Sequence, residues 1–187
     1  MSLPAAPAAR HRRVAEDFTR VSAAVTDWDA PTPVPEWRAR DVPRHLVEWS
    51  SEFLRSVDVI LTAGPSPLHD PHGAWRHHRE QIQSLVDAED ADRDVTHPQL
   101  GTLPLQDMVD RFYTADVFMH TWDLAVATGQ DPALDEEHAE ALLQGMRPME
   151  EAMRSSGQFG PPVPVDDDAP ASAQLMGFIG RDPHWRP

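Results

Sequence analysis

DVFMHTWDLAVATG, at residues 116–129, is the most informative stretch of this sequence. The apolar pattern that leads into it predicts a helix over residues 105–128, and Gly129 is of a residue type that often ends a helix. Asp116 and His120 stand four residues apart, so their side chains leave the same helix face one turn from each other. That face continues an apolar stripe, and Asp123 falls on or beside it. The stripe consists of Leu105, Met108, Val109, Phe112 and Met119.

Polar side chains on a buried face need partners. A carboxylate or an imidazole in an apolar interior is costly unless it is hydrogen-bonded, ion-paired or bound to a metal. His45 is a third candidate, because it lies one turn after Val42 and one turn before Trp49 on the buried face of another predicted helix. Two imidazoles and one carboxylate form a recurrent catalytic metal set with a free coordination position. Spacing alone leaves open a metal site and a structural polar network, and it favours the network.

Other segments also show the apolar spacing of helices. The predicted helices cover residues 8–27, 41–64 and 71–88, a further one starts at Asp135, and a last amphipathic segment carries Leu175, Met176, Phe178 and Ile179. The expected buried faces include Ile60 and Met149, and Pro148 is expected to kink its helix. Residues 89–104 predict an acidic turn and a short extended stretch. The sequence therefore predicts an all-α bundle in a single domain over residues 1–187, with its site between facing helices.

Composition excludes several classes of function. The 31 acidic and 16 basic residues give a net charge of −15, which disfavours nucleic-acid and anionic-membrane partners. The absence of cysteine excludes disulfides and thiolate ligands and leaves histidine and carboxylate as the strong metal ligands. No apolar run approaches membrane-spanning length and the N-terminus lacks the apolar core of a signal peptide, so a cytoplasmic location is expected.

The remaining histidines are weaker candidates. His69, His72, His77 and His78 are dense in sequence, but the first two lie in a loop bounded by proline and glycine, and His77 and His78 diverge by about 100° around a helix. His78 alone falls on a buried stripe and stays a candidate ligand or pocket residue. His97 is a candidate acid or base at the mouth of the site, although an exposed loop is favoured. Surface positions are expected for His11, His138 and His184.

Asp123 and the aromatic residues of this region have two interpretations each. Asp123 either orients a ligand imidazole through its second ring nitrogen, or pairs with an arginine or caps a loop. Trp49, Phe118 and Trp122 either line a pocket or belong to the core, and aromatic residues at helical spacing favour the core. Trp37 follows a proline-rich link and is expected to pack against the bundle.

Three segments resemble one protein family. WRARDVPRHLVEW, FYTADVFMHTWDLAVATGQ and LMGFIGRDPHW are similar to the DinB-like, mycothiol-dependent maleylpyruvate isomerase superfamily, in particular to its short metal-binding members. The resemblance spans most of the chain in the same order. It implies a DinB/YfiT-like four-helix bundle with additional short helices and a divalent metal, commonly zinc, with nickel or manganese as alternatives. Carried over to this sequence, the ligands it implies are His45, Asp116 and His120, the three residues that the helical spacing selects.

The resemblance also suggests a class of function. Related short proteins are thought to use the metal to activate a low-molecular-weight thiol such as mycothiol for transfer to a small electrophile. The characterised isomerases have glutamate where this chain has Asp116, and they carry a C-terminal domain that these 187 residues lack, so maleylpyruvate isomerisation is not expected to transfer. The alternative is a non-enzymatic protein that binds or senses a small ligand, with a buried metal or a purely structural polar site. Partners would be small molecules, and a homodimer stays open.

Overall fold

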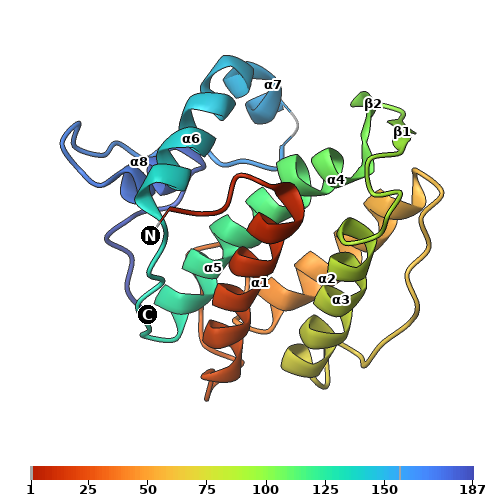
Figure 1. Cartoon of the computed structure of the whole chain (residues 1–187). Coiled ribbons are helices and arrows are strands. Elements are labelled where there is room, and N and C mark those ends of the chain that lie inside the picture. Colours follow the sequence, from red (N-terminus) through yellow and green to blue (C-terminus); the bar gives the residue numbers. More distant parts are fainter. Residues whose placement is uncertain (1, 156) are drawn as a thin grey trace.

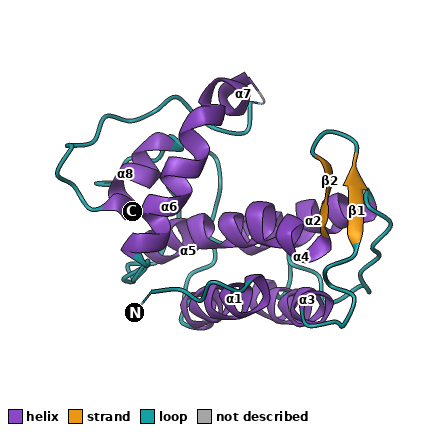
Figure 2. Cartoon of the chain, turned by 45° about the horizontal axis from the view of Figure 1, so that its top comes forward, coloured by secondary structure: helices purple, strands orange, loops and turns teal. Residues whose placement is uncertain are grey.

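Within residues 2–155 and 157–187, which the computed structural model describes, four long helices form the predicted bundle (Figure 1). Its members are α1 (Pro7–Ala23), α2 (Asp41–Arg55), α3 (Pro71–Val86) and a composite helix made of α4 (Leu105–Met108), η1 (Val109–Thr114) and α5 (Ala115–Ala127). The helix α1 packs against α3 and α5, and α2 packs against the same two helices. Figure 2 shows α1 and α3 side by side beneath the composite helix. The all-α fold class is therefore confirmed.

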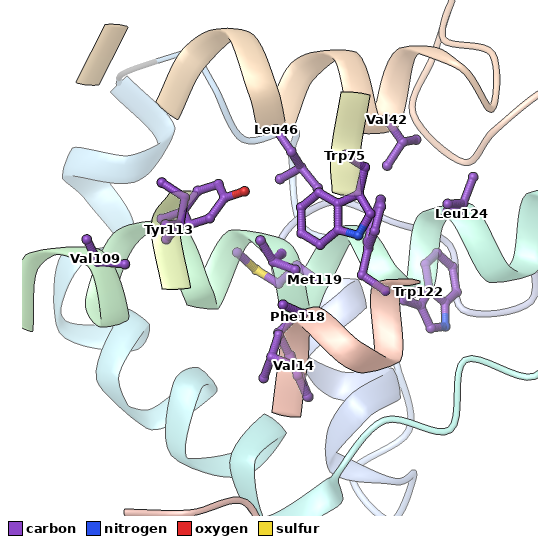
Figure 3. Packing of buried hydrophobic residues seen from close by; sticks show 14 of the residues in the cluster. Val14, Val42, Leu46, Trp75, Val109, Tyr113, Phe118, Met119, Trp122 and Leu124 are labelled. Carbon is purple, nitrogen blue, oxygen red and sulfur yellow. The ribbon is translucent and has the colours of Figure 1, made fainter. Parts of the chain in front are cut away.

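The bundle encloses one apolar cluster to which each of its helices contributes (Figure 3). Phe18 of α1 and Trp75 of α3 are both fully buried, and their ring centroids lie 4.3 Å apart. The indole Nε1 of Trp75 donates a hydrogen bond to the Thr19 hydroxyl at 2.9 Å, so this buried donor is satisfied. Val42 and Leu46 of α2 join the cluster on the side that carries His45 in the adjoining turn.

The predicted extended stretch is an antiparallel hairpin of β1 (Asp94–His97) and β2 (Gly101–Pro104). Asp94 pairs with Pro104 and His97 with Gly101, which has a φ of 77°. The positive φ explains the glycine at this position, because other residue types rarely adopt it. In both Figure 1 and Figure 2 the hairpin lies at the opposite end of the molecule from α8.

The C-terminal segments form a smaller layer beside α5. They comprise α6 (Glu136–Met146), η2 (Arg147–Met149), α7 (Glu150–Ser155) and α8 (Ala171–Phe178), and α6 packs against α8. Asp135 caps α6 by accepting a hydrogen bond from the His138 N–H at 2.8 Å. As expected, the helix is interrupted around Pro148, where α6 passes into the 3₁₀ turn η2. Met149 is nevertheless 53% exposed, so its predicted burial is wrong: the tighter turn changes the face on which it falls.

Two predicted helices are longer than the observed ones. α2 ends at Arg55 and not near Gly64, because Asp58 adopts a left-handed backbone with a φ of 62° and the N–H of Val59 bonds back to the last turn of the helix. Ile60 therefore lies outside the helix and is 79% exposed, not buried as predicted. α1 likewise ends at Ala23, four residues before the predicted end.

The composite helix contains a π-helical segment that the sequence did not indicate. A π-helix bonds each N–H to the fifth preceding carbonyl and is wider than an α-helix, so it changes the face on which the following residues fall. Phe112, predicted on the buried stripe, is only half-buried, while Tyr113 is fully buried in its place. The π-helical segment ends at Thr114, two residues before Asp116. No helix of the described residues is long and apolar enough to cross a membrane.

Candidate metal centre

His45, Asp116 and His120 meet between α2 and α5. One ligand atom from each lies within 4.8 Å of the others, and in the described part of the chain no other group of histidine and acidic side chains converges in this way. The Nε2 atom of His45 is 3.2 Å from one carboxylate oxygen of Asp116, and Nε2 of His120 is 3.5 Å from the other. The four-residue spacing on α5 places Asp116 and His120 one turn apart, as predicted, and the start of α2 supplies His45.

Access to the group is one-sided. The exposed fraction of the side chain is 31% for His45, 19% for Asp116 and 7% for His120. Solvent therefore reaches the group from the α2 side, past His45, while His120 lies against the core. A small molecule could approach the three ligand atoms along that side.

Two tryptophans frame the group. The indole Nε1 of Trp49 donates a hydrogen bond to Oδ2 of Asp116 at 2.9 Å. Trp37 stacks on the His120 ring with centroids 5.6 Å apart and planes 18° apart, and its centroid is 5.0 Å from that of His45. The sequence predicted that Trp37 packs against the bundle but gave no reason to place it at the site, because it comes from the link between α1 and α2.

The charges of the group support one another. Burial by itself raises the pKa of the Asp116 carboxyl, but the charge of His120 and the hydrogen bonds from His45 and Trp49 outweigh it, and this pKa lies below its ordinary value. Burial lowers the pKa of His120, while Asp116 and Asp123 raise it, and the balance lies above the ordinary value. Without a metal the group thus favours a charged Asp116 carboxylate, the form that binds metal, together with a protonated His120, which would release its Nε2 proton on metal binding.

Asp123 makes both of the contacts that the sequence left as alternatives. Its Oδ2 lies 2.8 Å from Nδ1 of His120, and its two oxygens accept hydrogen bonds from Nε and Nη2 of Arg181 at 3.1 and 3.2 Å. Burial raises the pKa of the Asp123 carboxyl, and Arg181 and His120 lower it below its ordinary value. Asp123 itself is fully buried. Arg181 lies in the segment LMGFIGRDPHW, and its role at the site could not be predicted from the sequence.

The donor set fits a divalent metal. An ionised carboxylate only accepts hydrogen bonds, so Nδ1 of His120 carries the proton that Asp123 accepts, and Nε2, which faces Asp116, is the ring nitrogen left for a metal. Tetrahedral zinc with bonds of about 2.0–2.1 Å places neighbouring ligand atoms about 3.3 Å apart. The two nitrogen-to-oxygen distances, 3.2 and 3.5 Å, run to different oxygens of Asp116, and one donor atom from each of the three side chains lies within 4.8 Å of the others. Two imidazole nitrogens and a carboxylate are also a common set for catalytic zinc.

The dense histidine segment does not form a second site. His72 contacts the Ser22 hydroxyl, His77 lies 3.3 Å from the carbonyl oxygen of Thr62, and His78 lies 2.7 Å from the Ser50 hydroxyl. His78 is buried, as its stripe predicted, but it is not in the group that could hold a metal. His97 lies in the hairpin, where its ring packs 5.1 Å from that of Phe53.

Two of the three predicted surface histidines are not on the surface. His11 is fully buried, with Nδ1 3.0 Å from the Thr114 hydroxyl. His138 is half-buried, and its ring packs edge-on against Phe118 with centroids 4.8 Å apart. Both predictions were wrong because the burying residues come from other helices and leave no mark in the local pattern. His184 is exposed, as predicted.

Of the three aromatic residues considered as pocket-lining, Phe118 lines a cavity of about 250 Å³ between α1, α5 and the start of α6. Arg13 and Asp17 also line it, and none of the three candidate metal ligands does. Trp122 is buried in the core, and Trp49 belongs to the candidate metal centre.

Comparisons with known proteins identify the family of the chain. A family model described as mycothiol maleylpyruvate isomerase N-terminal domain matches residues 11–125, more than half of the chain. Two curated proteins, both uncharacterized and from two strains of Mycobacterium tuberculosis, are 30% identical to this chain over an alignment of 181 positions that covers 94% of this chain and 97% of each relative. No solved structure matches the chain. The family match includes His45, Asp116 and His120 and ends before Arg181.

Proposed function

The chain belongs to the mycothiol maleylpyruvate isomerase N-terminal domain family, part of the DinB-like superfamily, and from this premise we propose that it binds a divalent metal and activates a low-molecular-weight thiol. The metal would be held by His45, Asp116 and His120, with zinc as the first choice. The thiol would be of the mycothiol type and its acceptor a small electrophile. The protein would then be a thiol-dependent transferase or isomerase.

One observation carries the proposal: the three ligand atoms converge within 4.8 Å, with Nδ1 of His120 held by Asp123 and Nε2 directed at Asp116. When bound, a divalent metal supplies a Lewis acid that stabilises a thiolate at neutral pH. The residues of the chain supply the rest. Asp116 neutralises part of the metal's charge, and Trp49 orients that carboxylate through its indole N–H.

The thiol would enter from the solvent side. His45 is the most exposed of the three ligands, so a cosubstrate would approach past α2. Trp37 stacks on the His120 ring and also packs against the His45 ring, so it borders the group beside both imidazoles. This arrangement leaves one open side for thiol and electrophile, which is what a transfer between two small molecules requires.

A structural polar network is the competing interpretation, and one observation favours it. Each candidate ligand already has a partner within the protein: His45 and His120 contact Asp116, and Asp116 also accepts from Trp49. Such a network satisfies its own buried charges without a metal. A non-enzymatic protein that binds or senses a small ligand through the same residues is a third candidate. Metal content tests the polar network, and a thiol assay separates the enzyme from the binding or sensing protein.

The test begins with metal content. Elemental mass spectrometry on tag-free protein, purified without added metal or chelator, is expected to find close to one divalent metal per chain. The variants His45→Ala and His120→Ala are each expected to lose it. His77→Ala is the matched control, because His77 on α3 is half-buried like a ligand but lies outside the candidate metal centre, with its ring 3.3 Å from the Thr62 carbonyl oxygen.

Equal metal content in all three variants would contradict the ligand assignment. If the wild type carries no metal and takes up none from zinc, nickel or manganese solutions, the polar network is the correct interpretation. If the wild type does carry a metal, the metal-loaded protein is tested for conjugation of mycothiol to small electrophiles, with His45→Ala as the blank. Stoichiometric metal without any thiol-dependent turnover would favour the binding or sensing protein.

A further inference from the structure

The C-terminal segment, residues 177–187, reaches the candidate ligand His120 through two side chains. Arg181 holds both oxygens of Asp123, and Asp123 in turn contacts Nδ1 of His120. We infer that Arg181 is a positioning residue of the metal centre and that docking of the C-terminal segment, residues 177–187, is thermodynamically coupled to metal binding. The inference rests on the proposed function, because it concerns the metal that His120 would bind.

The contact between Arg181 and Asp123 is of the kind that fixes geometry. Arg181 offers Nε and Nη2 to the two carboxylate oxygens, a paired arrangement that defines the plane of the carboxylate as well as its position. The carboxylate is fully buried and the arginine side chain is only 12% exposed. Without Arg181, Asp123 would lose two of its three hydrogen bonds from side chains and the arginine charge that offsets its own.

Orientation of His120 follows from orientation of Asp123. The hydrogen bond at Nδ1 decides which ring nitrogen carries the proton and how the ring is turned. A metal at Nε2 requires both. Mutation of a residue that hydrogen-bonds to a metal ligand typically weakens metal binding by about 10- to 100-fold.

The turn at Gly180 places Arg181 beside Asp123. Gly180 has a φ of 89°, and a Cβ there would lie 2.9 Å from Cα of Gly160, so only glycine allows the turn and the close approach. The N–H of Arg181 bonds back to the carbonyl of Met176 in α8 at 2.8 Å. Arg154 donates to the carbonyl oxygens of Gly160 and Phe178 and so joins the two strands of chain that meet at this turn.

This part of the chain lies outside the matched family domain, which ends at residue 125. The ligands come from within that domain, whereas the residue that steadies one of them comes from more than fifty residues further along. By linkage, a segment that increases the affinity for metal must itself be held more firmly when metal is bound, by the same factor. The C-terminal segment is therefore the part of this protein through which metal occupancy could be sensed or regulated.

The first experiment compares zinc affinity in three variants, using a competing chelator to set the free zinc concentration. Arg181→Ala is expected to raise the dissociation constant for Zn²⁺ at least 10-fold. Arg181→Lys is expected to restore only part of the lost zinc affinity, since an ammonium group lacks the paired donors. Arg186→Ala is the matched control: it removes an exposed arginine of the same segment whose side chain contacts the Trp185 carbonyl. Its dissociation constant should equal that of the wild type.

The second experiment uses the wild-type protein and needs no variant to fold. Amide hydrogen exchange over residues 177–185 is expected to slow at least 10-fold in saturating zinc, relative to metal-free protein. Nitrogen-15 chemical shifts of His120, which distinguish the two ring nitrogens, should report a proton on Nδ1 in the wild type and a changed pattern in Arg181→Ala. A merely structural arginine would not move those shifts.

The outcomes separate this inference from the proposed function. If the wild type binds zinc and Arg181→Ala binds it equally well, or if zinc leaves exchange in residues 177–185 unchanged, the inference is wrong while the metal centre stands. If the wild type binds no zinc at all, the metal centre itself is refuted and the inference with it. If Arg181→Ala does not fold, the exchange measurement on the wild type decides.

Discussion

Two histidines buried in the bundle should make the protein sensitive to acid. His11 is fully buried and His78 is 3% exposed. Burial, together with the charge of His78 and Arg79, lowers the pKa of His11 to about 3. Burial and the neighbouring His77 lower the pKa of His78 to about 4. Both values lie well below about 6.5, the ordinary value that an unfolded chain restores.

The sign follows from proton binding. Between about pH 6.5 and the folded-state pKa, the unfolded chain binds a proton at each histidine and the native protein does not, so the free energy of unfolding falls as the pH falls. At pH 5.0 the expected loss is about 2 kcal/mol for each histidine relative to pH 7.5. The two together should cost about 4 kcal/mol, a large fraction of the stability of a typical domain.

Urea denaturation followed by tryptophan fluorescence at pH 7.5 and 5.0, with chelator present so that metal release does not contribute, measures this loss. His78→Gln keeps a polar group near Ser50 but cannot be protonated in this range, so it should lose about 2 kcal/mol less than the wild type on acidification. The raised pKa of His120 acts in the opposite direction, since its stabilisation is present at low pH and is lost as the pH rises. This contribution of His120 is the same in the wild type and in His78→Gln, so it cancels in the difference between their stability losses.

The control is His184→Gln, which changes an exposed histidine and should leave the pH-dependent loss as it is in the wild type. The reasoning is refuted if His78→Gln and the wild type lose equal stability between pH 7.5 and 5.0. It is refuted equally if His184→Gln reduces the loss as much as His78→Gln does.

Three further predictions concern the metal centre, a turn and the core. Trp49→Phe removes the N–H that orients Asp116 and should weaken zinc binding about 10-fold by chelator competition, and an unchanged affinity would show that this hydrogen bond has no such role. Gly180→Ala places a Cβ 2.9 Å from Cα of Gly160 in addition to its unfavourable φ. It should lower the melting temperature more than Gly129→Ala, because Gly129 has a φ of 68° but open space around it, and that substitution should cost about 1–2 kcal/mol. Equal shifts would contradict the steric argument. Phe18→Ala removes a fully buried ring and should cost about 3–5 kcal/mol in urea denaturation, so that a loss below 1 kcal/mol would contradict its place in the core.

The helices could be predicted from the sequence because their apolar residues repeat at the period of the structure. The same regularity brought Asp116 and His120 onto one face, since a four-residue spacing has one meaning in a helix. His45 followed from the apolar residues on either side of it in α2. For these residues, position along the chain determines direction in space.

The features that were missed depend on contacts between distant parts of the chain. Trp37 reaches the site from an irregular link, and Arg181 reaches it from the end of the chain. Neither position shows a periodic pattern that would predict its neighbours. The burial of His11 depends likewise on the helix that faces it, through Thr114. The π-helical segment changed the phase of the composite helix, and a stripe extrapolated with one constant period could not include that change.

The short carboxylate at position 116 bears on whether a metal centre can form at all. Aspartate is one methylene shorter than the glutamate that the characterised isomerases have at this position. In the structure its two oxygens are already 3.2 and 3.5 Å from the nitrogens of His45 and His120, so the shorter side chain does not separate the carboxylate from the histidines. The close approach of α2 and α5 makes up for the missing methylene. Glutamate in the same place would have to fold back or displace His45. Asp116→Glu should therefore weaken zinc binding in this chain. Tighter zinc binding by that variant would contradict this reasoning and show that α2 and α5 move to accept the longer side chain.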